Sequence, residues 1–454
     1  MSQHPSPPRS FASNLRYDPA YGERCVQALE TALAHTPAYA GWRRFDPGPQ
    51  VDVFTRLAAL PALTKGDLRA YGPHGVVPEE RDLDAALARG EVALVTTSGT
   101  TSDRVTNVWC QSWWDASEQA SWQLNAHTRS LRHGLEREAI LTSPWCAGFP
   151  CEEGYLPAER RRDGRFLYLS ERSNPSTWTD ALLDRMVAEL NAFRPATLEA
   201  NPSFLARLAR HIVRHGSDVH QPTAIVLTYE NPSALHRRQI AQAFAAPIVS
   251  SYGSTEAGYV FVECEAGSMH QVCAACHVDY LPLQLAHGGR ELGRILVTTF
   301  HDPWRALLRF DIGDVVRLRA ESCPCGNDEG LTLLSIEGRT VNLTRTPAGR
   351  AVTQGMVDRA LAAVHGLQAY QLVQTGLATY HLLWVADEDG AGVQAAAALV
   401  GLYGPAAQVT AERVGAIAPE PPGKYRLTKA TWPLDADALL DGAYAPRRLQ
   451  GEHR

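Results

Sequence analysis

The sequence lacks any apolar run of the roughly eighteen residues that a membrane-spanning helix needs. Residues 1–14 are rich in Pro and Ser and contain no apolar core of the kind found in secretory signals. An excess of basic residues is also absent, because 43 Lys and Arg face 49 Asp and Glu and leave a net charge of −6 at pH 7. This balance argues against nucleic acid or an anionic membrane as the main partner. We therefore expect a cytoplasmic protein whose first 20 residues are a flexible lead-in.

Internal repeats are missing as well, and low complexity is confined to the first dozen residues. A chain of 454 residues is too long for one ordinary hydrophobic core, so two or three domains are expected. The hydrophobic content of 45% and the charged content of 20% are ordinary for a globular protein. These values exclude a fibrous or disordered chain.

Strand-like apolar runs alternate with helical patterns in the middle of the chain. The apolar runs occupy 138–143, 223–229 and 246–252, and helical periodicity appears at 179–193 and 201–213. Such alternation predicts an α/β fold with a mostly parallel sheet flanked by helices. Ligands of these sheets bind at the carboxyl ends of the strands.

Further elements are expected on both sides of this region. Before it, the pattern predicts helices over 21–34, 54–60, 64–73 and 117–135, the third capped by Thr64. After it, the pattern predicts a late antiparallel subdomain with strands at 293–300 and 307–318. A helix at 352–364, a hairpin at 369–387 and a helix from Ala391 then predict a small α+β unit. We place the domain boundary between residues 338 and 339.

A loop rich in Ser and Thr follows the apolar run that ends at Val95. It reads TTSGTTS over 96–102, and its hydroxyls and backbone amides suit a polyphosphate. The lysine and the glycine spacing of the P-loop pattern are missing. By itself, such a loop is more often an ordinary turn.

Four other motifs follow the loop in a fixed order. They are SSYGSTEAG at 250–258, RFDIGD at 309–314, EGR at 337–339 and PPGKYR at 421–426. In this order and spacing the series resembles the adenylate-forming superfamily of acyl-CoA synthetases, adenylation domains and luciferases. Stretches at 36–42, 60–76, 193–209 and 227–244, and CPCG at 323–326, are similar to its phenylacetate–CoA ligase-like branch.

The resemblance implies ATP-dependent activation of a carboxylic acid. The carboxylate attacks the α-phosphorus of ATP, pyrophosphate leaves, and the acyl group of the acyl-AMP passes to CoA as a thioester. It also implies an N-terminal ATP- and acyl-binding domain over 1–338 and a mobile C-terminal lid domain over 339–454. Catalysis of this kind is mostly positioning and electrostatics. A homodimer is the family-level expectation.

The resemblance assigns roles to particular residues. Lys424 would bridge the carboxylate and the α-phosphate, Glu256 would hold Mg²⁺, and Arg339 would reach the nucleotide from the hinge. Asp314 would bind the ribose hydroxyls, Tyr252 would stack near adenine, and Glu230 would lie on the adenine side. The remaining ATP-binding candidates are Thr97, Ser98, Gly99, Thr100, Thr101, Gly253, Ser254 and Thr255. Arg104 would supply the cation that the loop lacks.

Two departures from the family pattern leave alternatives open. The loop continues with Ser102 and Asp103 where the family has a Gly and then Pro, and Asp103 adds negative charge near phosphates. After Arg339, the segment TVNLTRTPAG lacks the usual acidic hinge residue. An adenylating ligase of secondary metabolism that transfers the acyl group to an amine, a carrier protein or another nucleophile fits as well. A non-catalytic nucleotide-binding relative is the third interpretation.

The nine cysteines fall into two groups. Cys25, Cys110, Cys146 and Cys151 are far apart and are expected to be reduced. The other five lie between 264 and 325 and suit a closed tetrahedral zinc site. By resemblance we favour Cys264, His270, Cys323 and Cys325 as ligands. The alternative set is Cys273 and Cys276 with Cys323 and Cys325.

Four tryptophans lie between residues 109 and 122, and Trp145 follows in SPWCAGFP. By resemblance, this second stretch is where the family has its acyl-pocket loop. We name Trp145, Phe149 and Tyr229 as candidate walls of a pocket for an aromatic acid. For most of the other tryptophans, packing in the core is the simpler explanation.

Overall fold

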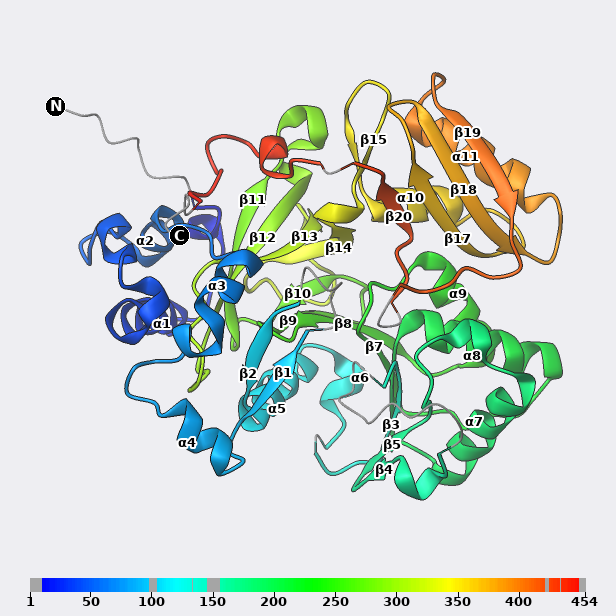
Figure 1. The fold of residues 1–454 in the computed structure, drawn as a ribbon, viewed down its shortest axis with the longest axis horizontal. Coiled ribbons are helices and arrows are strands. Elements are labelled where there is room, and N and C mark those ends of the chain that lie inside the picture. The colour runs from blue at the N-terminus through cyan, green and yellow to red at the C-terminus, as the bar shows by residue number, and fades with distance from the viewer. Residues whose placement is uncertain are drawn as a thin grey trace. The chain divides into compact units, whose positions relative to one another are not determined.

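The computed structural model describes residues 10–97, 104–132, 134–144, 156–420, 424–432 and 434–448. The chain forms two compact units, each assembled from separate segments (Figure 1). Unit 1 contains 1–124, 252–336 and 435–454, and unit 2 contains 125–251 and 337–434. The functional boundary proposed at 338 stays a prediction. No helix among the described residues is long and apolar enough to cross a membrane.

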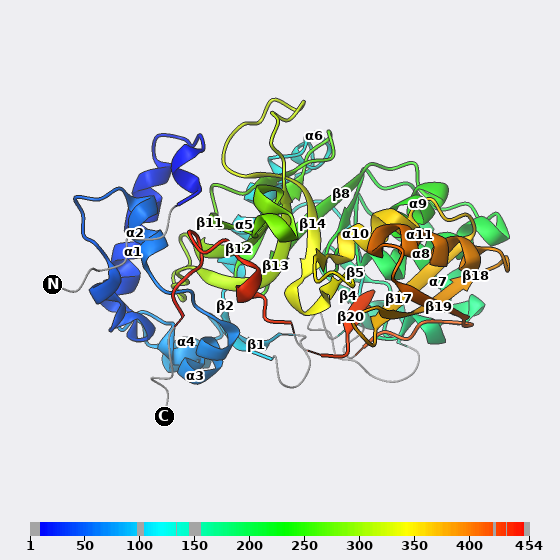
Figure 2. The same ribbon diagram turned by 90° about the horizontal axis from the view of Figure 1, so that it is seen from above.

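Unit 1 begins with four helices, drawn in blue (Figure 2). They are α1 (Tyr21–His35), α2 (Val53–Ala59), α3 (Lys65–Gly75) and α4 (Leu83–Ala88). Thr64 caps α3 as the sequence predicts, because its hydroxyl accepts from the backbone of Asp67 while the Asp67 side chain accepts from the backbone of Thr64. This capping box fixes the start of α3, whose first residue is Lys65.

The rest of unit 1 is largely antiparallel, which confirms the late antiparallel subdomain. Its sheet has the strand order β11-β12-β13-β14-β10-β9. The strands are β9 (Gly258–Glu263), β10 (Met269–Gln271), β11 (Cys276–Pro282), β12 (Leu292–Thr299), β13 (Phe310–Leu318) and β14 (Thr332–Arg339). A separate hairpin of β1 (Ala93–Thr96) and β2 (Thr106–Trp109) flanks the Ser/Thr-rich loop. Helix α5 (Gln111–Trp122) follows the hairpin.

Unit 2 contains the predicted parallel sheet. Strands β3 (Glu138–Leu141), β5 (Phe166–Tyr168), β6 (Thr197–Ala200), β7 (Ala224–Leu227) and β8 (Ile248–Ser254) pair in parallel. A short antiparallel strand, β4 (Arg162–Asp163), pairs with β5. Helices α7 (Asp180–Phe193), α8 (Pro202–His215) and α9 (Ala234–Ala243) alternate with these strands and share their apolar core.

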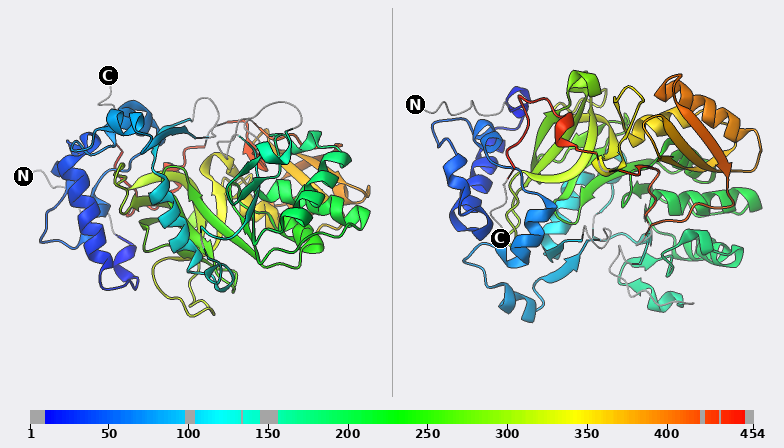
Figure 3. Two further views of the ribbon diagram at one scale, coloured as in Figure 1. Left: turned by 90° about the horizontal axis from the view of Figure 1, so that it is seen from below. Right: turned by 45° about the horizontal axis from the view of Figure 1, so that its top comes forward.

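The segment after residue 350 adds an α+β portion to unit 2. Its sheet has the order β19-β18-β17-β20, in which β17 (Leu367–Gln374) and β18 (Thr379–Ala386) form the predicted hairpin. Helix α11 (Ala391–Tyr403) lies along this sheet (Figure 3), and both contribute to one apolar cluster. The remaining elements are β15 (Thr344–Arg345), β16 (Ala351–Val352), α10 (Gln354–Leu361), β19 (Gln408–Arg413) and β20 (Thr428–Ala430).

One helix prediction is wrong. The pattern over 117–135 predicts a continuous helix, but α5 begins earlier and ends at Trp122, and a single turn, α6 (Ala126–Arg129), follows. Asn125 explains the break because its side chain accepts a hydrogen bond from the backbone of His127 and starts the new turn. A local cap therefore competes successfully with the helical pattern.

Candidate functional site

In unit 1, Tyr252 near the end of β8 contacts the side chain of Asp314. The Tyr252 hydroxyl donates a hydrogen bond of 2.8 Å to Oδ2 of Asp314, which is buried on β13. Gly253 follows, and a Cβ atom there would lie 2.1 Å from the carbonyl oxygen of Gly258. Only glycine allows this approach of two backbone segments. Two residues nominated from separate motifs, Tyr252 and Asp314, are thus in direct contact.

The same turn is held by its own polar groups. Ser254 accepts from the backbone N–H of Ala257 at 3.1 Å, and the Thr255 carbonyl accepts from Nη1 of Arg305 at 3.1 Å. Glu256 is buried, with 1% of its surface exposed. A buried carboxylate at the end of a fixed turn suits a hard cation such as Mg²⁺, which prefers oxygen ligands.

Lys65 is a residue that the sequence analysis did not select. Its Nζ lies 3.4 Å from Oε1 of Glu256, and it is the first residue of α3. The two positions are far apart in the sequence, so spacing gives no indication of the contact. The stretch LTKGDL predicts a helix capped by Thr64 and resembles the family, but neither property indicates a contact of Lys65 with Glu256.

The Ser/Thr-rich loop is described only at its ends. Thr97 donates its backbone N–H to the Val105 carbonyl, and its hydroxyl accepts from the backbone N–H of Val105 at 3.0 Å. Arg104 is exposed. Ser98, Gly99, Thr100 and Thr101, together with Ser102 and Asp103, lie outside the described residues.

In unit 2, Glu230 joins two of the predicted motifs. Its Oε1 accepts the backbone N–H of Tyr425 at 2.8 Å, and its Oε2 accepts the Ser203 hydroxyl at 2.9 Å. Burial raises the pKa of Glu230 above its ordinary value, and these hydrogen bonds and the charge of Lys424 only partly offset the effect. Lys424 precedes Tyr425 and exchanges two backbone hydrogen bonds with Glu420. The lysine motif is therefore attached to the loop that follows β7.

Tyr229 lies in that loop in a strained conformation. Its φ of 69° is in the left-handed region, which costs a non-glycine residue on the order of 1–2 kcal/mol. The Tyr229 hydroxyl donates to Oε1 of Glu199, a carboxylate buried on β6. The other two pocket candidates, Trp145 and Phe149, lie outside the described residues.

Arg339 is exposed at the end of β14. Two residues earlier, Glu337 is fully buried, pairs with Arg359 at 2.8 Å and accepts from the Thr353 hydroxyl. A single 3-10 turn, Thr340–Asn342, follows Arg339. The start of the predicted hinge is thus fixed by Glu337, while the arginine side chain faces solvent.

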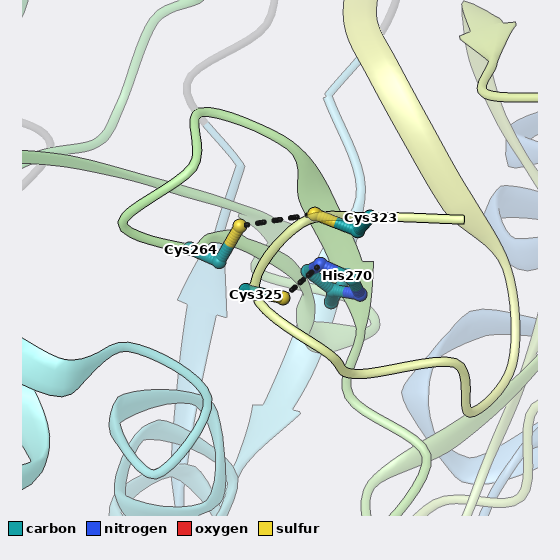
Figure 4. A group of neighbouring side chains, drawn as sticks. All are labelled: Cys264, His270, Cys323 and Cys325. Carbon is teal, nitrogen blue, oxygen red and sulfur yellow. Dashed lines mark hydrogen bonds between the residues drawn. The ribbon is translucent and has the colours of Figure 1, made fainter. Parts of the chain in front are cut away.

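Four sulfur and nitrogen ligands from three segments of unit 1 converge (Figure 4). Cys264, His270, Cys323 and Cys325 offer ligand atoms that all lie within 4.8 Å of one another. The Sγ atoms of Cys264 and Cys323 are 3.6 Å apart, and Sγ of Cys325 is 3.3 Å from Nε2 of His270. Tetrahedral zinc with its usual bond lengths would separate two sulfurs by about 3.8 Å and a sulfur from a nitrogen by about 3.6 Å. The four side chains therefore fit a zinc ion.

The two remaining cysteines of the region belong to other surroundings. Cys276 is buried and donates its thiol to the Val272 carbonyl at 3.8 Å. Burial raises the pKa of the Cys273 and Cys276 thiols as it does that of Cys264, so only the geometry separates the two cysteine sets. Among the described residues, neither belongs to a group whose ligand atoms converge.

Comparisons with known proteins identify the fold. No family model matches the chain. The CapK protein of Staphylococcus aureus is 27% identical over 179 residues, which is 39% of this chain and only 39% of that protein. Two crystal structures of 2-hydroxyisobutyryl-CoA ligase match nearly the whole chain.

The first structure contains the ligase in its postadenylation state with R3-HIB-AMP. It is 17% identical, covers 93% of this chain and 90% of its own, and has a TM-score of 0.67. The second is an open conformation with 2-HIB-AMP and CoA, which is 18% identical, covers 89% of both chains and has a TM-score of 0.56. The chain therefore has the fold of the adenylate-forming superfamily, as the motif series predicts. The phenylacetate–CoA ligase-like branch stays a prediction.

Proposed function

We propose that the protein is an ATP- and Mg²⁺-dependent ligase that adenylates a carboxylic acid and transfers the acyl group to CoA. A carboxylate oxygen forms a bond to the α-phosphorus, the bond to the β-phosphate breaks, and pyrophosphate leaves. The CoA thiol then attacks the acyl carbonyl and AMP leaves. The observation that supports this most is the hydrogen bond from Tyr425 to Glu230, because it joins the lysine motif to the family-like stretch at 227–244 in a chain with this fold.

In unit 1, we assign the nucleoside to Tyr252 and Asp314. A carboxylate that accepts from Tyr252 still has a free oxygen edge for ribose hydroxyls. Glu256 would hold Mg²⁺, and Lys65 would place a second positive charge beside the phosphates. Lys65 is therefore a second candidate, beside Arg104, for the cation that the Ser/Thr-rich loop lacks.

In unit 2, we assign Lys424 to the developing charge on the carboxylate and α-phosphate. Positioned charges act strongly in a site that excludes water, so this residue is our main catalytic candidate. Glu230 would lie on the adenine side, and Arg339 would act from the hinge. Thr97, Ser98, Gly99, Thr100 and Thr101, with Gly253, Ser254 and Thr255, complete the proposed ATP contacts.

The acid and its acceptor are the least constrained parts of the proposal. We propose an aromatic acid in a pocket lined by Trp145, Phe149 and Tyr229. Both 2-hydroxyisobutyryl-CoA ligase structures hold an acyl-AMP, and one also holds CoA. A ligase that transfers the acyl group to an amine or a carrier protein is the second candidate. The observation that favours it is the 3-10 turn after Arg339, which contains no acidic residue.

We also propose a structural zinc ion on Cys264, His270, Cys323 and Cys325. These residues lie before β10, in β10 and in the turn before β14. The ion would join these three segments to one another. Such a site contributes directly to folding free energy.

ATP–pyrophosphate exchange tests the proposal. The purified protein is given ATP, Mg²⁺ and a panel of aryl, arylacetic, hydroxy, fatty and amino acids, each with and without CoA. Exchange with one class would support adenylation, and a thioester product would support CoA as the acceptor. Exchange without a thioester would favour the second candidate. ATP binding without exchange for any acid would contradict adenylation and favour a non-catalytic nucleotide-binding protein.

A further inference from the structure

Helices α7 and α8 of unit 2 carry a second group of metal-ligand side chains, which consists of aspartates and histidines and not of cysteines. Asp180 and Asp184 lie one turn apart on α7, and His211 and His215 lie one turn apart on α8. Ligand atoms of Asp180, His211 and His215 all lie within 4.8 Å of one another. The two helices run side by side over this stretch (Figure 1). We propose that these three side chains bind a divalent transition-metal ion, Zn²⁺ by preference.

The separation of one pair of ligand atoms matches that expected around such an ion. Nδ1 of His211 lies 3.5 Å from Oδ1 of Asp180. A tetrahedral zinc with one nitrogen and one oxygen ligand would hold those atoms about 3.4 Å apart. The imidazole rings of His211 and His215 have centroids 4.4 Å apart, since the residues are four apart on one helix face. Two imidazoles and a carboxylate leave a fourth position for water, as in open zinc sites.

Asp184 provides the orientation that a histidine ligand requires. Its Oδ1 lies 2.8 Å from Nε2 of His211, the ring nitrogen that faces away from Asp180. A carboxylate on Nε2 keeps the proton there and leaves the lone pair of Nδ1 for the metal. His211 is only 4% exposed, so its ring is held by packing, whereas Asp180 and Asp184 are 72% and 65% exposed. The carboxylate of Asp180, which would complete the site, therefore reaches solvent.

A hydrogen-bonded histidine between two aspartates would account for part of this geometry. It would not account for the ring of His215, which lies beside that of His211 on the same helix face. A metal ion bound by both imidazoles and by Asp180 would account for all three positions. The bound ion would connect the first turn of α7 to the last turn of α8.

The test is calorimetric titration of the full-length protein with Zn²⁺. The protein is first loaded with zinc and then dialysed against a weak chelator, so that a tight thiolate site stays filled while an open site with three protein ligands is emptied. We expect one further equivalent to bind to the wild-type protein and to His365→Ala, a control that removes an 81% exposed imidazole elsewhere in unit 2. His215→Ala should lose this equivalent or bind it at least about tenfold more weakly. Because His215 is exposed, we expect the variant to fold like the wild-type protein. Circular dichroism verifies the fold.

Asp184→Asn tests the orienting role separately. Loss of such a second-layer carboxylate lowers metal affinity by about 10–100-fold, and we expect a decrease in that range. Absence of a further equivalent in the wild-type protein, or equal binding by His215→Ala, would overturn the proposal. The result does not depend on the cysteine site or on ligase activity, since the measured quantity is the difference in bound Zn²⁺ between His215→Ala and the wild-type protein.

Discussion

The backbone N–H of Tyr425 donates a 2.8 Å hydrogen bond to Oε1 of Glu230 and so fixes the position of the preceding residue, Lys424. Burial raises the pKa of Glu230, and the nearby lysine charge favours its ionised form. The two residues belong to motifs almost two hundred positions apart in the chain. Their contact gives the proposed catalytic lysine a defined place on unit 2.

Lys424→Ala should remove adenylation and preserve ATP binding. Loss of one positioned charge at a reacting group typically lowers the rate by about 10²–10³-fold, and we expect at least that decrease in pyrophosphate exchange. The matched control is Lys429→Ala, which removes a half-buried lysine paired with Glu420 in the same part of the chain. Exchange that survives in Lys424→Ala at the level of the control would show that another residue acts on the α-phosphate.

Lys65→Ala should weaken the use of ATP. If this lysine supplies the cation that the Ser/Thr-rich loop lacks, its removal leaves Glu256 without the partner now 3.4 Å away and raises KM for ATP. We expect an increase of about tenfold, the effect of losing one charge-assisted contact of about 1.5 kcal/mol. Arg69→Ala, an exposed cation one turn along α3, is the control. The same KM for Lys65→Ala and wild type would leave the role to Arg104.

Zinc analysis separates the two cysteine sets. Freshly purified protein should contain one zinc bound by thiolates, and Cys323→Ser should lose it together with several degrees of Tm, because the ion contributes to folding. Hydrogen bonds outweigh burial and lower the pKa of Cys323, whereas burial raises the pKa of Cys264 and Cys325, so the convergence of the four side chains carries this assignment. Cys273→Ser should keep the zinc. Loss of zinc from Cys273→Ser but not from a Cys264→Ser variant would favour the alternative set.

Asp358 should make unit 2 sensitive to pH. Burial raises the pKa of Asp358 from 3.8 to about 6, although its Oδ2 accepts the backbone N–H of Ala234 at the start of α9. The folded state therefore retains a proton that the unfolded state releases. The contribution of Asp358 to the free energy of unfolding falls as pH rises from about 4 to 6 and does not change above 6.

Asp358→Asn should abolish this contribution. Relative to wild type, the variant should gain on the order of 2 kcal/mol in the free energy of unfolding between pH 4 and pH 7. Urea unfolding at the two pH values measures it, and Asp218→Asn, at an exposed position, is the control. A difference between Asp358→Asn and wild type that does not change with pH would contradict a buried, protonated carboxyl.

The sequence predicts the fold well because its patterns are local. The buried strand at 224–227 and the capping box of Thr64 and Asp67 both arise from neighbouring residues. The same reasoning fails at Asn125, where one side-chain hydrogen bond interrupts a helical pattern. It also leaves open which cysteines converge, since Cys273 and Cys276 have the more familiar spacing but face other surroundings.

Contacts between distant positions are what the sequence does not reveal. Nothing in the spacing predicts that Lys65 reaches Glu256, or that Asp184 and Asp180 lie on either side of His211. Both depend on how helices pack, which the periodicity of a single helix does not specify. The motif order identifies candidate residues, and only the fold shows which of them touch.

The most direct measurement of the central claim follows an oxygen atom. An acid that supports exchange is prepared with heavy oxygen in its carboxylate and is converted completely in the presence of ATP and the acceptor. Attack of the carboxylate on the α-phosphorus transfers one labelled oxygen to AMP, and mass spectrometry of AMP should detect it. Label found in inorganic phosphate with formation of ADP, or absent from every phosphate product, would contradict adenylation.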